Sequence, residues 1–114
     1  MSADTVHDLP TPALLIDDAR VEANISRAQA YASAQGVALR PHAKTHKSPD
    51  FARRQLDAGA VGVSVAKLGE AELMVDSGIS DVFVANTVMG SDKARRAVAL
   101  ASRARFAIGA DHRS

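Results

Sequence analysis

The chain has 114 residues, of which 46% are hydrophobic, so its length and composition suit one small globular domain. Its 14 basic and 13 acidic residues nearly cancel and are interspersed, which argues against nucleic-acid and membrane-surface partners. The absence of cysteine excludes disulfides and thiolate zinc sites, and a cytoplasmic location is the expectation. No stretch approaches the roughly 20 apolar residues of a membrane helix, so we expect no membrane partner.

The first predicted elements are a short strand and a helix. Residues 13–17 form an apolar run after two prolines, which favour extended backbone. Asp17 or Asp18 then offers an N-cap. Apolar residues at steps of three and four predict a helix over residues 20–35, and Gly36 fits its C-terminal cap.

Strands and helices alternate in the rest of the chain. Residues 37–46 are predicted as a strand, and Ser48 followed by Pro49 predicts the start of a helix that ends near Gly59. Further strands are predicted over residues 61–66, 81–85 and 105–109, and further helices over residues 70–77 and 91–104. Ser91 and Asp92 are the expected cap of the last helix.

This alternation predicts an α/β fold with a parallel sheet and right-handed crossovers. About four strands from residue 37 onward would be half of an eight-stranded barrel, which takes about 250 residues. An open doubly wound sheet is the alternative. Because no closing helix follows the strand at residues 105–109, we expect a fragment of a barrel.

Residues 39–47 contain the cluster of side chains with the clearest chemical potential. Alternate residues of a strand share a face, which places four basic side chains together: Arg40, His42, Lys44 and His46. This face would point into a barrel, near the strand ends where barrel active sites lie. Neighbouring cations favour a neutral lysine, which Schiff-base chemistry requires. A solvated basic strand is the alternative interpretation.

Other ligand sites have weaker support in the sequence. In a strand, His42 and His46 lie about 13 Å apart, too far to share one metal ion, and no metal site is predicted. No glycine-rich phosphate loop is present. Lys67 follows a predicted strand, so it would lie at the catalytic rim of a barrel and is a further candidate for ligand contact.

Three segments resemble the D-threonine aldolase and D-serine dehydratase-like family. They read TPALLID at residues 11–17, RPHAKTHK at 40–47 and GAVG at 59–62. The family is part of the alanine racemase N-terminal-domain group of enzymes that depend on pyridoxal 5'-phosphate (PLP). The resemblance implies a TIM-type β/α barrel whose lysine, at the end of the first barrel strand, forms the internal aldimine. Lys44 occupies the matching place, and we assign His42 and Arg40 as its cofactor-binding neighbours.

The resemblance also implies a function and an organisation. It implies a PLP-dependent lyase acting on D-β-hydroxy amino acids, of the D-threonine aldolase or D-serine dehydratase type. A racemase of the same fold group and a non-catalytic PLP-barrel fragment are the alternatives. Members are about three times as long, so residues 1–17 would be a strand that packs on a missing C-terminal β domain, and residues 18–114 the first half of the barrel. The divalent metal is expected only with that missing domain, and the full-length form is expected to be a homodimer.

A half barrel would also leave apolar surface uncovered. We expect an open sheet edge and exposed inner positions, such as Val63, Val65, Val82 and Val84, to make the chain associate.

Overall fold

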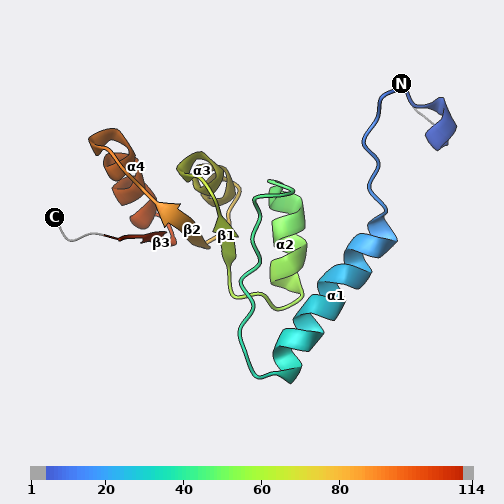
Figure 1. The fold of residues 1–114 in the computed structure, drawn as a ribbon, viewed down its shortest axis with the longest axis horizontal. Helices are drawn as coiled ribbons and strands as arrows, with labels where there is room; N and C mark the ends of the chain where they lie inside the picture. Colours follow the sequence, from blue (N-terminus) through green and yellow to red (C-terminus); the bar gives the residue numbers. More distant parts are fainter. Residues whose placement is uncertain (1–4, 112–114) are drawn as a thin grey trace.

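The computed structural model describes residues 5–111, so the first four and last three residues of the chain lie outside the described part (Figure 1). Its elements in chain order are the 3₁₀ helix η1 (Val6–Asp8), α1 (Asp18–Ala34), α2 (Pro49–Asp57), β1 (Val63–Val65), α3 (Leu68–Asp76), β2 (Asp81–Thr87), α4 (Ser91–Ala101) and β3 (Arg105–Gly109).

The three strands form one parallel sheet in the order β1-β2-β3. Helix α3 connects β1 to β2, helix α4 connects β2 to β3, and both lie on the same side of the sheet (Figure 1). The predicted α/β fold with parallel strands is therefore confirmed. In the described part of the chain the sheet is open, and no closed barrel is formed.

The hydrophobic core lies between this sheet and its helices. The strand register aligns Val63 with Val82 and Val65 with Val84, so these side chains share one face, and each is almost completely buried. The expectation that these four valines are exposed inner positions is wrong. Strand alternation separates two faces but does not reveal which one the crossover helices cover.

The opposite face of the sheet is the one that α3 and α4 leave uncovered. Ser64 and Phe83 are paired in the register, and Phe83 is paired with Ala107 on β3. Ala107 is exposed and Phe83 is half-buried. We call this surface the inner face of the sheet, because it would point into a barrel.

Residues 13–17, predicted as a strand, are extended but pair with no other strand within residues 5–111. The chain here leads away from the sheet (Figure 1), and the side chain of Leu14 is 92% exposed. A strand needs a partner for its backbone hydrogen bonds, and the described chain supplies none. Packing of this segment on a further domain remains a prediction.

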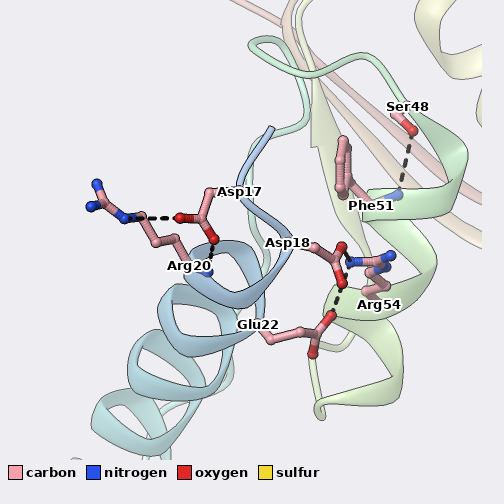
Figure 2. Close-up of polar contacts among 7 residues, drawn as sticks. All are labelled: Asp17, Asp18, Arg20, Glu22, Ser48, Phe51 and Arg54. Atoms are coloured by element: carbon pink, nitrogen blue, oxygen red, sulfur yellow. Dashed lines mark hydrogen bonds and ion pairs between the residues drawn. The ribbon is translucent and has the colours of Figure 1, made fainter. Parts of the chain in front are cut away.

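Helices α1 and α2 begin where their capping signals predict. The Asp17 carboxylate accepts a hydrogen bond from the N–H of Arg20 at 3.1 Å, and the Ser48 hydroxyl accepts one from the N–H of Phe51 at 3.4 Å (Figure 2). Helix α1 ends at Ala34, and Gly36 follows with a φ of 67°. Helix α4 differs slightly, because Gly90 rather than Ser91 occupies its N-cap position.

Helices α1 and α2 are held together mainly by ion pairs. Nη1 of Arg54 on α2 lies 2.5 Å from Asp18 and 3.1 Å from Glu22, both on α1 (Figure 2). Two hollows of about 440 and 210 Å³ are lined by α1, α2 and the segment before α2. Ala32 is the buried residue of α1. Helix α1 is therefore less closely packed than the helices that cover the sheet.

Candidate functional site

The candidate site is the turn that contains Lys44. The segment before it runs parallel to β1, because Ser64 donates its N–H to Pro41 O at 2.8 Å and Ala43 donates to Ser64 O at 2.7 Å. The N–H of Lys47 then bonds to Ala43 O at 2.8 Å and closes a turn over residues 43–47. This turn, which we call the lysine turn, follows the strand-like segment and so lies at the carboxyl end of the sheet.

The strand predicted over residues 37–46 forms only in part. Residues 39–43 make parallel backbone hydrogen bonds with residues 61–64, including one isolated bridge between His42 and Ser64, and the chain then turns at residues 43–47. The imidazole Nδ1 of His42 accepts the N–H of Lys44 at 3.2 Å, and Nδ1 of His46 accepts the N–H of Ser48 at 3.0 Å. Side chains that bond to nearby backbone groups compete with a strand ladder in this way.

The predicted common face of four basic side chains does not form. Arg40 and His42 precede the lysine turn, and the bridge places His42 on the inner face with Ser64. Lys44 and His46 lie within the turn, where the alternation of a strand no longer applies. The ring of His46 points toward α2, because it meets the ring of Phe51 edge-on at 5.7 Å between centroids.

Arg40 is held at the amino end of the strands. Its Nη1 lies 2.7 Å from Oδ1 of Asp81, the first residue of β2, and Oδ2 of Asp81 lies 3.7 Å from Nε of Arg105, the first residue of β3. The structure therefore does not bring the Arg40 guanidinium together with Lys44.

Lys47 and Glu70 form a contact at the carboxyl end of the sheet that was not predicted from the sequence. Nζ of Lys47 lies 3.3 Å from Oε1 of Glu70, on the first turn of α3. Oε2 of Glu70 accepts the N–H groups of Ala66 and Lys67 at 2.8 and 3.2 Å. An acidic residue at the third position of a helix that follows a strand is a recognisable capping signal, and it could have identified Glu70.

Burial alone would raise the pKa of Glu70. Hydrogen bonds from the N–H of Ala66 and from Lys47 outweigh burial, so the pKa of Glu70 lies below its usual value. The side chain of Glu70 is only 11% exposed, whereas that of Lys47 is 56% exposed. The carboxylate is therefore charged at neutral pH and fixed in position by its donors.

Lys67 lies where its sequence position predicts, exposed at the carboxyl end of β1 and immediately before α3. It lines a depression of about 460 Å³ together with Lys93 and Arg96 of α4. Both Nε and Nη2 of Arg96 donate to the carboxylate of Glu72, at 2.7 and 2.6 Å. This ion pair joins α3 to α4 beside the depression.

Within residues 5–111, no group of three or more histidine, aspartate or glutamate side chains is arranged to hold a metal ion. None of the helices in this range combines the length and hydrophobicity that crossing a bilayer requires.

Comparisons with known proteins identify clear relatives. The chain is 41% identical to a D-threonine aldolase of an Arthrobacter species over 109 residues, which are 96% of this chain and 29% of the relative. It is 48% identical to the D-threo-3-hydroxyaspartate dehydratase of a Delftia species over 82 residues, which are 72% of this chain and 22% of the relative. No protein-family model matches the chain.

The fold also matches a solved structure. The crystal structure of the D-threonine aldolase from Filomicrobium marinum superposes with a TM-score of 0.92 at 44% sequence identity, over 94% of this chain and 29% of that one. This chain thus spans less than a third of the length of these relatives. The family resemblance inferred from the sequence is confirmed, and the chain is a homologue of the D-threonine aldolases and D-threo-3-hydroxyaspartate dehydratases.

Proposed function

We propose that this chain is part of a PLP-dependent lyase that acts on D-β-hydroxy amino acids, with Lys44 as the residue that carries the cofactor. The observation that carries the proposal is the position of Lys44, on an exposed turn at the carboxyl end of a parallel sheet. Active sites of β/α barrels lie at this end of their strands. The names of the relatives favour a lyase over the alternative of a racemase.

The residues present fit covalent attachment of an aldehyde cofactor at Lys44. Lys44 is exposed and makes no ion pair within residues 5–111, whereas the neighbouring Lys47 is engaged by Glu70. An amine that is not held in an ion pair can be reached by a carbonyl group, and accessibility of this kind favours attachment at Lys44 over Lys47. When bound, PLP supplies an electron sink for the bond that is broken in the substrate.

We assign supporting roles to the two other predicted site residues. His42 accepts the N–H of Lys44 and lies on the inner face, so it would contact the cofactor and fix the start of the lysine turn. The guanidinium of Arg40 is occupied by Asp81. Arg40 would therefore contribute to cofactor binding indirectly, by anchoring the segment that presents His42 and Lys44.

A divalent metal, a phosphate site for PLP and a homodimer would depend on chain beyond the portion that matches here. One solved structure of a D-threo-3-hydroxyaspartate dehydratase mutant is in the metal-free form, which is in keeping with the proposal of a divalent metal in the whole enzyme. The proposed reaction is of either the D-threonine aldolase type or the D-serine dehydratase type.

A PLP titration of the purified chain, followed by borohydride reduction and peptide mapping, tests the assignment of Lys44. We expect a reduced adduct on Lys44 that disappears in Lys44→Ala and persists in Lys93→Ala, because Lys93 is an exposed lysine of α4. Adducts spread evenly over the exposed lysines would contradict the proposal for this chain and favour the alternative of an inert fragment.

A further inference from the structure

Two lysines of the lysine turn carry amines that an aldehyde can reach. Lys44 and Lys47 are both exposed and lie three positions apart in the same turn. The hydrogen bond from the N–H of Lys47 to Ala43 O holds the two ends of this turn together. Some feature of the molecule must therefore distinguish the two amines if only Lys44 carries the cofactor.

Glu70 is placed to make this distinction. One carboxylate oxygen holds Nζ of Lys47 at 3.3 Å, while the other accepts two backbone N–H groups between β1 and α3. These N–H donors fix the carboxylate relative to the sheet, and its side chain is largely buried. Glu70 thus connects the lysine turn to the turn that follows β1, which is the adjacent loop at the same rim.

The backbone of Lys47 is consistent with such an anchor. Its φ is 51°, in the left-handed region that a residue with a side chain adopts only at a cost. The contact with Glu70 is one interaction that can offset this cost. Loss of the contact would both release the amine of Lys47 and loosen the end of the turn that presents Lys44.

We propose that Glu70 is a positioning residue that directs aldehyde attachment to Lys44, by holding the ammonium group of Lys47 and bracing the lysine turn against the start of α3. This inference rests on the proposed function of Lys44. In the attachment step, the amine nitrogen forms a double bond to the aldehyde carbon, and the aldehyde oxygen leaves as water. Borohydride then delivers hydride to that carbon and makes the product stable for mapping.

The test compares adduct formation on individual lysines in the wild-type chain and in Glu70→Gln. PLP is added, the product is reduced with borohydride, and the adducts on Lys44, Lys47 and Lys93 are quantified by mass spectrometry. We expect the ratio of Lys47 to Lys44 adduct to rise about threefold in the variant, the size expected for losing an ion pair with one exposed partner.

Glu72→Gln is the matched control, because it removes a carboxylate from the same helix whose partner is Arg96. Its ratio of Lys47 to Lys44 adduct should equal that of the wild type. A purely structural effect of Glu70→Gln would raise the adducts on Lys47 and Lys93 together, and this result would overturn the inference.

A second measurement keeps the inference testable if Glu70→Gln does not fold. The wild-type chain is treated with formaldehyde and borohydride, which methylate accessible amines, and the rates at Lys47 and Lys93 are compared. Slower methylation of Lys47 is expected, and equal rates would refute the inference. If Lys44 of the wild type forms no PLP adduct, the proposed function fails; if it does and Glu70→Gln leaves the ratio unchanged, only this inference fails.

Discussion

Arg40 and Asp81 form an ion pair that passes directly over Gly62. Their closest atoms, Nη1 and Oδ1, are 2.7 Å apart, and their side chains are 27% and 19% exposed. A Cβ atom on Gly62 would meet both Nη1 of Arg40 and the backbone O of Asp81. The pair thus joins the segment before the lysine turn to β2, across β1, at the end of the sheet remote from Lys44.

Gly62→Ala should destabilise the chain by about 1–3 kcal/mol, the usual cost of forcing an extra methyl group into a closely packed site. The added Cβ would lie 2.7 Å from Asp81 O and 2.9 Å from Asp81 Cγ, and the backbone oxygen cannot move without disturbing β2. Urea unfolding followed by circular dichroism measures the change. Gly69→Ala is the control, because nothing lies within 4 Å of its Cβ position, and it should be neutral or stabilising.

Arg40→Met and Asp81→Asn should each lower the free energy of unfolding by about 1–3 kcal/mol. Asp81→Asn leaves the Arg40 guanidinium without its carboxylate, and Arg40→Met leaves Asp81 with only the more distant Arg105. If Arg40 acts only as an anchor, the two variants should also reduce PLP labelling of Lys44 to the same extent. Labelling that falls in Arg40→Met but not in Asp81→Asn would instead indicate direct contact of Arg40 with the cofactor. Equilibrium unfolding and adduct mapping are the two measurements.

Acid should weaken the fold partly through Glu70. Its pKa in the folded chain is below the usual value, so its stabilising contribution is complete above about pH 4.3, the usual glutamate pKa, and is lost as the pH falls through the lower folded value. Glu70→Gln should therefore be less stable than the wild type at pH 7 and lose less stability between pH 5 and pH 3. Urea unfolding at several pH values measures this, and parallel curves for the two proteins would disprove it.

The uncovered inner face and the free edge of β3 should make the chain associate. Within residues 5–111, β3 pairs only with β2, and Ala107 on its inner face is exposed. Sedimentation velocity should show an average mass that rises with concentration. Ala107→Glu should reduce this association, because a charge on an exposed strand disfavours pairing with another chain. Ser102→Glu, in the exposed turn after α4, is the control and should leave association unchanged.

Local signals in the sequence predict much of this fold because they act over only a few residues. Ser48 and Pro49 begin α2 where expected, and Gly36 follows α1 with the positive φ that favours glycine. The strand at residues 105–109 is also where the sequence predicts it. Each of these features depends on a capping group or a short run of side chains, which can be identified without knowledge of the tertiary structure.

The errors arise where distant contacts decide the structure. The strand expected over residues 37–46 is cut short by the turn at residues 43–47, where His42 and His46 bond to nearby backbone N–H groups. The buried position of Val84 depends on which side of the sheet α3 and α4 occupy. The contact between Lys47 and Glu70 joins residues far apart in the chain, and only the folded arrangement brings them together.

Helix α1 is weakly packed, so it should unfold locally more readily than the strands of the sheet. The attachment of α1 to α2 depends on the charges of Arg54, Asp18 and Glu22, beside hollows that the apolar side chains do not fill. Ions in solution screen such exposed charges but leave the buried valine core unaffected. Rising ionic strength should therefore speed amide hydrogen exchange in α1 before that in β2, as expected if α1 and the strands of the sheet unfold in separate cooperative units.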